Sequence, residues 1–345
     1  MKKNGYLLWI LLLLLPMYFL FRCSTIRESI GEEDEIIVFA DSLDWLQYKD
    51  ALNSVFGKEF KTPVLEREFL LKWIPYRYFD LYKKEKNIFI LGRLDSQEPV
   101  SKNVIELLNP EIIEGVKSGQ YFYIPKPNAW ALNQYVLFLV SNSRDDMIQK
   151  IHDLGDLMYR DFRKFYYSRM SKRMFAQMEQ SKLEKYIEAH FPFHMRVQHD
   201  YFIATESLED GFVWIRRLHP DRSIFVHWLS QPKGFQLTSR WVIDERNRLA
   251  QKYYSGDQVV EDETHAYSTQ FKDWRAIRLE GTWRNDRVMV GGPFRSYTFI
   301  DSTTNRIYMI DYYVQAVGQR KKPFLDQLYV ITHSFRPLKS PMGEK

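Results

Sequence analysis

The richest mixture of side chains that could bind a ligand lies near the C-terminal end, in the segment 283–295. It combines an indole, an amide and charges of both signs with two glycines: Trp283, Asn285, Asp286, Gly291, Gly292 and Arg295. The glycines precede a proline and allow a tight turn and the close approach of another backbone. Such a segment could hold a sugar, a peptide terminus or a partner strand. The alternative is a bulged hairpin in which Asn285 and Asp286 bind backbone donors and Trp283 belongs to the core.

The chain contains one cysteine, Cys23, and its position suggests a second kind of chemistry. Lys2 and Lys3 precede an unbroken apolar and aromatic run over residues 6–21, which ends two positions before Cys23. A charged start followed by an apolar stretch is typical of a secretory signal. As a helix the run would span roughly 24 Å, less than the roughly 30 Å hydrocarbon core of a bilayer. We therefore predict a signal sequence over residues 1–22 rather than a membrane-spanning helix.

Acylation would explain why the only thiol, Cys23, lies at the end of the signal. Each buried methylene group adds about 0.8 kcal/mol of membrane affinity, so several acyl chains such as palmitate hold a protein at a bilayer. Arg22 stands where a processing site usually has a small residue, and an uncleaved signal anchor is the alternative. We predict lipid attachment at Cys23, a tether over residues 23–35, and a location at the bacterial cell envelope, on the outer membrane or the periplasmic face. The membrane is then an expected partner.

Charge and motif content exclude several classes of partner. The formal net charge is +5, and Lys2, Lys3 and Arg22 supply three of these charges with no acid among residues 1–22, which leaves +2 for the rest. We expect no nucleic-acid partner from so small an excess. Phosphate-binding, dinucleotide-binding, zinc-protease and serine-elbow motifs are absent, so we expect no cofactor. The basic, aromatic segment 159–173 could touch an anionic surface, and the solvated face of a long helix is its alternative.

Three histidines, His190, His194 and His199, stand near Asp200 in the sequence. Zinc would require imidazoles fixed on one helix or on paired strands. Pro192 breaks the helix that the spacing of four between His190 and His194 would need. We therefore expect no metal site and interpret these histidines as ordinary residues between strands.

The first half of the sequence alternates between strand-like and helix-like segments. Short apolar runs at 36–40 and 88–92 are typical of buried strands, and capped helical segments separate them. An apolar stripe at spacings of three and four then predicts a long helix over residues 143–180. The pattern predicts an N-terminal layered αβ domain over residues 36–180.

The second half is richer in strands. Runs at 196–205, 212–217, 223–230 and 287–290 alternate or are continuously apolar, as strands are. We predict a C-terminal domain over residues 181–345, built on a mostly antiparallel sheet flanked by helices. The fold class is therefore α+β, with a layered αβ half that includes a long helix and an antiparallel half.

The C-terminal sequence also resembles a known family. Residues 281–286 (GTWRND) followed by 289–294 (MVGGPF) are similar to the signature of a Bacteroidota lipoprotein family, domain-of-unknown-function family 4837. Further similar stretches extend the resemblance over nearly the whole chain after the signal: Asp44-Trp45, 65–69, 130–134 and 212–216. The resemblance implies a lipid-anchored envelope location. It implies no activity, because the family has none assigned.

Together these features favour a membrane-tethered envelope lipoprotein whose C-terminal sheet binds an envelope protein or a cell-wall glycan. We expect a binding protein rather than an enzyme. The alternative is a metal-independent hydrolase that uses a carboxylate pair in a cleft. A scaffold without any small ligand is a third hypothesis. Two carboxylates that converge in a deep pocket would favour the hydrolase, and a shallow aromatic surface would favour the binding protein.

Overall fold

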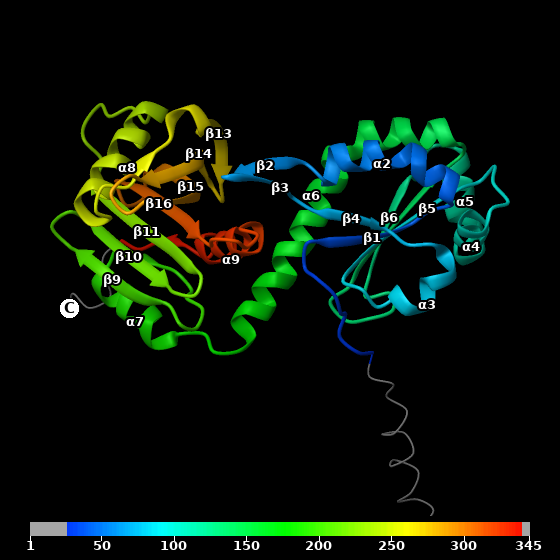
Figure 1. Ribbon diagram of the computed structural model, residues 1–345, viewed down its shortest axis with the longest axis horizontal. Helices are drawn as coiled ribbons and strands as arrows, with labels where there is room; N and C mark the ends of the chain where they lie inside the picture. The colour runs from blue at the N-terminus through cyan, green and yellow to red at the C-terminus, as the bar shows by residue number, and fades with distance from the viewer. Residues whose placement is uncertain (1–25, 340–345) are drawn as a thin grey trace, which may run out of the picture. The chain divides into compact units, whose positions relative to one another are not determined.

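The computed structural model describes residues 26–339, so the predicted signal at 1–22 and Cys23 lie outside the described residues. Within that range no helix is both long enough and apolar enough to cross a bilayer. The chain divides into two compact units (Figure 1): one comprises the residues up to Lys49 with Leu71–Asp153, and the other comprises Asp50–Leu70 with the chain from Leu154 onward. The excursion Asp50–Leu70 thus folds with the second unit although it lies early in the sequence. The domain boundary expected at 180/181 stays a prediction.

The first unit is built on a five-stranded sheet. Its order is β4 (Leu70–Trp73), β1 (Glu35–Phe39), β5 (Asn87–Arg93), β7 (Tyr135–Ser141) and β6 (Tyr123–Pro127). The neighbours β1, β5 and β7 run parallel, and β6 is antiparallel to β7. Parallel strands are usually covered on both faces, and β5 and β7 are accordingly buried along almost their whole length.

Short helices connect these strands: α2 (Ser42–Phe56), η1 (Tyr76–Tyr78), α3 (Phe79–Tyr82), α4 (Pro99–Leu107) and α5 (Pro110–Lys117). Both α4 and α5 begin at a proline, whose missing N–H costs nothing in the first turn of a helix. Asn109 caps α5 by accepting a hydrogen bond from the Ile112 N–H at 2.8 Å. The side chain of Asp41 does the same for α4, accepting from the Val100 N–H at 2.9 Å.

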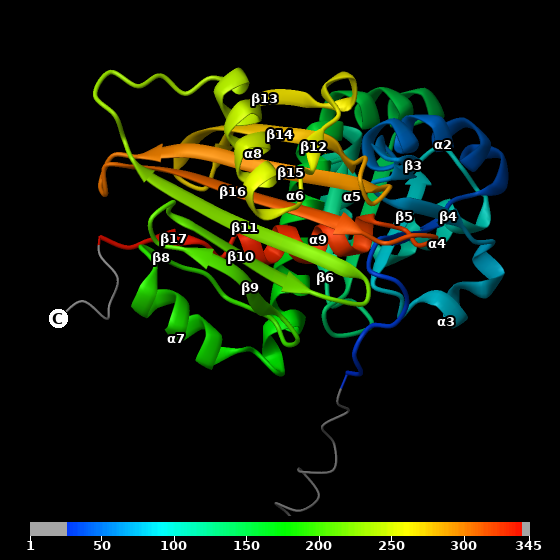
Figure 2. The same ribbon diagram turned by 60° about the vertical axis from the view of Figure 1, so that its left-hand side comes forward.

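The second unit contains a larger, antiparallel sheet (Figure 2). Its order is β12 (Gln258–Val259), β14 (Trp274–Asn285), β15 (Val290–Asp301), β16 (Arg306–Gln315), β11 (Asp221–Ser230), β10 (Phe212–Arg217) and β9 (Phe202–Ser207), with β13 (His265–Phe271) beside β14. Two small ribbons accompany it, β2 (Glu59–Thr62) with β3 (Val64–Arg67), and β8 (Phe193–His194) with β17 (Arg336–Pro337). The expected α+β fold, with a layered half and an antiparallel half, is confirmed.

The helices of the second unit are α7 (Ser181–His190), α8 (Ser239–Tyr253), α9 (Lys322–Thr332), the short η2 (Glu261–Glu263) and the part of α6 (Arg144–Ala176) from Leu154 onward. On one face of the large sheet, Val242 and Leu249 of α8 pack against rings that include Trp283 and Phe294. On the other face, α9 and the end of the chain pack against Tyr297 and its neighbours. Because alternate residues of a strand point to opposite faces, each strand supplies both layers.

Two expected strands are wrong in part. In the first, residues 195–201 form no strand, and β9 begins only at Phe202. There the Arg196 N–H donates to the Ser334 hydroxyl and the Val197 N–H to the Glu184 carboxylate, each at 2.8 Å, so side chains take the place of a sheet neighbour. In the second, residues 286–289 form a turn rather than a strand, and β15 starts at Val290.

Candidate functional site

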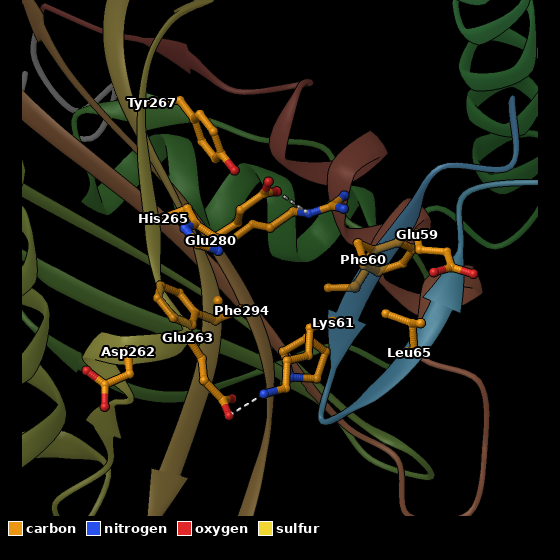
Figure 3. A pocket seen from close by; sticks show the side chains of 14 residues that line it. Glu59, Phe60, Lys61, Leu65, Asp262, Glu263, His265, Tyr267, Glu280 and Phe294 are labelled. Carbon is orange, nitrogen blue, oxygen red and sulfur yellow. Dashed lines mark hydrogen bonds and ion pairs between the residues drawn. The ribbon is translucent and has the colours of Figure 1, made fainter. Parts of the chain in front are cut away.

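A cavity of about 390 Å³ lies within the second unit, on the face of the large sheet that α9 covers. Strands β13, β14 and β15 line one side, the β2–β3 hairpin lines the other, and α9 contributes Leu325 (Figure 3). The lining combines carboxylates, cations and rings: Glu59, Phe60, Lys61, Asp262, Glu263, His265, Tyr267, Glu280, Phe294 and Arg295. It is concave and joins residues from distant parts of the described chain, and we take it as the candidate site.

Glu66 fixes the hairpin against the start of α9. Its two carboxylate oxygens accept hydrogen bonds from the backbone N–H groups of Lys321, at 2.8 Å, and Lys322, at 3.0 Å. The Thr62 hydroxyl donates to the same carboxylate at 2.7 Å. A helix N-terminus carries unsatisfied N–H groups and a partial positive charge, which a carboxylate satisfies. This contact joins residues 255 positions apart and helps to place the excursion 50–70 in the second unit.

Arg295 is the central cation beneath the cavity, and only 7 % of its side chain is exposed. Its Nε lies 3.4 Å from Glu280 Oε2, and its Nη2 lies 3.6 Å from Glu68 Oε1. Burial by itself would lower the pKa of this guanidinium. The surrounding Tyr312, Glu68 and Glu280 more than offset burial and raise that pKa well above its usual range. Arg295 is therefore a permanent positive charge.

Glu280 is the matching anion on β14. Arg278 and Arg295 both contact its carboxylate. Burial would raise the pKa of Glu280, but the two guanidinium groups outweigh burial and hold the pKa below its usual value. The hydroxyl of Tyr267 points toward this carboxylate (Figure 3), and the pKa of Tyr267 is raised, first by burial and then by the negative charge of Glu280. Glu280 is thus ionised and Tyr267 is protonated near neutral pH.

The rim of the cavity is closed by an ion pair between the hairpin and the segment before β13. Lys61 Nζ lies 2.5 Å from Glu263 Oε1, as the dashed line in Figure 3 marks. A hydrogen bond from Lys61 lowers the pKa of Glu263. More than half of the Lys61 side chain is exposed, so the pair adds at most about 1 kcal/mol to stability. It positions the hairpin tip rather than holding the fold together.

A buried lysine lies next to this network. Lys322, at the start of α9, is 1 % exposed, and its Nζ lies 2.5 Å from Asp326 Oδ2. Asp326 also accepts hydrogen bonds from the hydroxyls of Tyr166, at 2.6 Å, and Tyr167, at 3.0 Å. Every charge here has an opposite partner, as buried charges require. The floor of the site is therefore rigid and electrically compensated.

This electrostatic arrangement suits binding better than proton transfer. A general acid that works near neutral pH needs a carboxyl group whose pKa is raised. The pKa values of Glu263 and Glu280 are both lowered by their cationic neighbours. Both side chains therefore present fixed negative charge to whatever occupies the cavity. Fixed charges and rings can orient hydroxyl, amide or ammonium groups without reacting with them.

A carboxylate pair with divergent pKa values exists elsewhere in the second unit. Glu179 and Glu184 are hydrogen-bonded to each other: burial raises the pKa of Glu184, and Arg196 lowers that of Glu179. However, Glu184 accepts a hydrogen bond from the Val197 N–H at 2.8 Å, and Arg196 donates hydrogen bonds to Glu179 from both Nε and Nη2. Neither carboxylate lines the candidate cavity. The pair fastens the loop before β9 to α7 and offers no support for a hydrolase in the cavity.

Residues 179–334 match a domain of unknown function, DUF4837, and residues 29–175 match a second one, DUF8532. The expected family is therefore confirmed for the C-terminal part of the chain. The expectation that the same family extends over nearly the whole chain is corrected, because stretches such as 65–69 and 130–134 lie within the DUF8532 match.

Two solved structures illustrate how distant the structural likenesses are. LpqN, described as involved in cell envelope biogenesis of Mycobacterium tuberculosis, is 14 % identical with a TM-score of 0.27, over 41 % of this chain and 81 % of LpqN. The Ran-binding protein Mog1p of Saccharomyces cerevisiae is 9 % identical with a TM-score of 0.28, over 43 % of this chain and 90 % of Mog1p. At these TM-scores neither likeness supports an inference about activity. No curated protein matches the chain.

Three of the predicted binding residues, Trp283, Asn285 and Gly292, make contacts that shape the sheet and its β14–β15 turn. Trp283 is 2 % exposed and packs on the α8 face of the sheet. Asn285 donates to Asp257 Oδ1 at 2.7 Å, and its own oxygen accepts the N–H groups of Arg287 and Val288, which shapes the β14–β15 turn. A Cβ atom on Gly292 would lie 2.0 Å from the Val314 carbonyl oxygen, so glycine lets β15 approach β16.

The other predicted residues are divided between the hairpin and the cavity. Asp286 is exposed in the turn, with Arg284 Nε 3.4 Å from its carboxylate. A Cβ atom on Gly291 would lie 2.6 Å from the Trp283 carbonyl oxygen, again a close backbone approach. Arg295 alone lines the cavity. The structure therefore does not bring the predicted set together into one site, and ligand binding at the segment 283–295 stays a prediction.

The histidines of the sequence cluster have separate partners. His190 stacks on Tyr186, and His194 Nδ1 lies 2.7 Å from Glu188. The His199 ring lies 3.7 Å from the carboxylate of its neighbour Asp200. Over residues 26–339, no group of three or more histidine, cysteine or acidic side chains is arranged to hold a metal ion.

The basic, aromatic segment 159–173 of α6 fits the solvated-face interpretation in part, because Arg160, Lys164, Lys172 and Arg173 are exposed, whereas two other arginines point inward. Arg169 is only 5 % exposed, and Arg163 lies over the rings of Tyr159 and Tyr167. These arginines are part of the interior of the second unit and not of a solvated helix face. The segment supplies cation–ring packing beneath α9.

The β2–β3 hairpin and β13, which supply much of the cavity, were not predicted from the sequence. Both carried a weak signal. Phe60 is the one apolar residue between Gly57 and Pro63, so the hairpin's only local signals are this ring between charged residues and the turn-favouring proline after it. In β13, residues 267, 269 and 271 are Tyr, Thr and Phe, an alternating set of strand-favouring types.

Proposed function

We propose that the DUF4837 domain is a non-catalytic binding module, and that its cavity receives a polar group of a partner envelope protein or cell-wall component. One observation carries the proposal: the ionisable side chains Glu263, Glu280 and Arg295 are held in their charged forms by opposite charges around a preformed cavity. Preorganised charges of both signs recognise polar ligands without paying for rearrangement on binding. Phe60 and Tyr267 add ring surface to the same cavity.

The same proposal includes a lipid anchor at the cell envelope. It is supported by the sequence, in which the single cysteine, Cys23, closes an apolar run that follows two lysines. Several acyl chains on that thiol would hold the chain at a membrane. Residues 27–30 already pair with the first unit, because the Leu132 N–H donates to the Arg27 carbonyl at 2.8 Å and the Ile30 N–H donates to the Lys84 carbonyl at 3.0 Å. The link between Cys23 and the folded unit is therefore shorter than the expected tether over residues 23–35.

Crosslinking in intact cells tests the binding module. A photoreactive amino acid is placed at Tyr267, which lines the cavity and is 44 % exposed. The matched control carries it at Leu208, which is 64 % exposed in the turn between β9 and β10, at the opposite edge of the sheet. We expect a discrete adduct from Tyr267 and none from Leu208. Equal adducts from both positions, or none from either, would contradict the proposal.

Mass spectrometry of the same preparations tests the anchor. We expect the N-terminal peptide to begin at Cys23 and to carry acyl chains. A full-length chain with an unmodified Cys23 would remove the lipoprotein part of the proposal and leave the binding module to be judged by the crosslinks.

A further inference from the structure

The strand β13 is an unusually open edge of the large sheet. Among the described strands it pairs with β14 alone, in an unbroken register from His265 opposite Glu280 to Phe271 opposite Trp274. Figure 2 shows it as the outermost strand on its side. Its residues are mostly exposed, and only Phe271 is buried. Its outer backbone edge therefore faces solvent over seven residues.

Edge strands are normally protected against pairing with other chains by lysine, proline, inward-pointing charges, bulges or covering elements. Residues 265–271 contain no charged residue and no proline, and their pairing has no bulge. The opposite edge, β9, is protected in three ways. Its register with β10 shifts at Trp214/Ile215, it carries Glu206, and Tyr186 of α7 donates a hydrogen bond to that glutamate at 2.8 Å. The contrast indicates that β13 is left open for pairing.

Cavities lie on both faces beside this edge. The candidate cavity is lined by His265 and Tyr267, which point to the α9 face. A second cavity, of about 880 Å³, is lined by Ser268 and Gln270 of the same strand, and by Ile277 of β14. Because side chains alternate between faces along a strand, a segment added beside β13 would direct its side chains alternately toward the two cavities.

From this geometry we propose that β13 accepts an extended polypeptide segment of a partner protein as an additional strand, with basic side chains directed toward the candidate cavity. The inference rests on the proposed binding function and specifies its ligand as a polypeptide. The charge of the cavity supports basic side chains: four carboxylates line it, those of Glu59, Asp262, Glu263 and Glu280, against two cations, Lys61 and Arg295. Main-chain hydrogen bonds to β13 provide affinity, and the cavities select the side chains.

Synthetic peptides test the pairing on the full-length protein in a mild detergent. The probe is a short peptide in which lysine and valine alternate, and two further versions carry backbone N-methyl groups on its odd-numbered or its even-numbered amides. An added strand uses only alternate N–H groups, so we expect one methylated version to bind like the parent and the other to bind at least about tenfold more weakly. A version with glutamate in place of lysine should also bind at least about tenfold more weakly.

Two protein variants locate the pairing. Ala266→Lys places a lysine at an exposed position on the edge strand β13. We expect this variant to bind the lysine–valine peptide at least about tenfold more weakly than the wild-type protein does. Phe202→Lys makes the matched change on β9, where Phe202 is 44 % exposed, and should leave peptide affinity unchanged. Circular dichroism and thermal unfolding confirm that both variants fold.

The outcomes separate this inference from the proposed function. Equal binding of both methylated peptides, or equal loss in both protein variants, overturns strand addition. Failure of all peptides, with crosslinks from Tyr267 that contain glycan, overturns the inference and retains the binding module. A dimer in sedimentation that Ala266→Lys dissociates also overturns it, because the occupant of β13 is then a second copy of this chain. Absence of any crosslink from Tyr267 refutes the proposed function itself.

Discussion

The two faces of the large sheet bury charge in different ways. On the α8 face, Arg246 and Asp311 form a closed pair, with Nε 2.7 Å from Oδ2, and both side chains are almost completely buried. Rings and aliphatic side chains surround this pair. On the α9 face, Arg295 shares Glu280 and Glu68 with other cations, and Glu280 is 27 % exposed at the candidate cavity. The Arg246–Asp311 pair is shut off from solvent, whereas the charges around Arg295 are spread over a network that reaches solvent.

The difference is visible in how the two carboxylates titrate. Burial dominates at Asp311 and raises its pKa despite Arg246. At Glu280 burial also acts upward, but Arg295 and Arg278 outweigh it and the pKa is lowered. A shared network thus keeps its carboxylate ionised, which a lone pair in an apolar layer does not do as well. A binding surface needs a carboxylate that stays ionised, whereas a core only needs an opposite charge beside each buried charge.

The largest expected effect comes from breaking the closed pair. Asp311→Ala leaves Arg246 buried without its carboxylate, and we expect a loss of about 3–5 kcal/mol in the free energy of unfolding. Chemical denaturation measures it. The control is the double replacement Arg246→Met with Asp311→Leu, which removes both charges and should cost less than Asp311→Ala alone. If the double variant costs as much, the surroundings of Arg246 and Asp311 do not form an apolar layer that can accept uncharged side chains.

The next largest effect is a pH dependence that arises on the α9 face. His333 stacks on Tyr329, and its pKa is lowered to about 3, first by burial and then by the cations Arg163, Lys272 and Arg278, against a hydrogen bond to the Tyr329 carbonyl. Because the folded pKa lies below the unfolded one, protonation favours unfolding, and stability falls as pH drops from about 6.5 toward 3.

His333→Phe keeps a ring at this position and removes the titration. Relative to that variant, we expect the wild-type protein to lose about 1.4 kcal/mol per pH unit between pH 6 and pH 4. Urea unfolding at several pH values measures the difference. Parallel stability curves for the two proteins would show that His333 accepts a proton in the folded state.

The fold could be predicted where local pattern decides structure. The apolar run of β5 and the stripe of α6 identified both elements, because parallel strands are buried on both faces and helices repeat every 3.6 residues. The β2–β3 hairpin was missed because its strands have four residues each, with exposed charges, and because Glu66 is held by α9, 255 positions away. No local pattern contains that contact.

The candidate site could be predicted only in part, for a reason of strand parity. Arg295 pairs with Glu280 across β14 and β15, so both point to the α9 face. Trp283 is three residues from Glu280 on the same strand and therefore points to the α8 face. Sequence proximity placed Trp283 and Arg295 in one site, but the register of the hairpin separates them. The face of the sheet to which a residue points follows from its pairing partner on the neighbouring strand. A single sequence does not give that pairing.

A smaller loss of stability is expected on the α9 face than at Asp311. Arg295→Met removes the central cation, but Arg278 still contacts Glu280, and Lys322 still lies 3.9 Å from Glu68. Both carboxylates also retain some access to water, so we expect a cost of about 1–2 kcal/mol in chemical denaturation. The adduct from the photoreactive group at Tyr267 should fall in the same variant. A loss as large as that of Asp311→Ala would erase the contrast between the two faces.

The smallest effect is expected at the tip of the β14–β15 hairpin, which belongs to neither buried layer. Asp286 is 72 % exposed and its partner Arg284 is 58 % exposed. Such surface pairs contribute little, so Asp286→Ala should change the free energy of unfolding by less than about 0.5 kcal/mol. It should also leave crosslinking from Tyr267 unchanged.

The neighbouring residue provides the control for this last prediction. Asn285 is 3 % exposed and binds Asp257 and two backbone N–H groups, so Asn285→Ala should cost about 1–3 kcal/mol while Asp286→Ala costs almost nothing. That pair of results would establish the hairpin tip as a structural turn. If Asp286→Ala instead abolished the Tyr267 adduct without loss of stability, the segment 283–295 would be the binding site. The proposal that the cavity on the α9 face binds the partner would then be wrong.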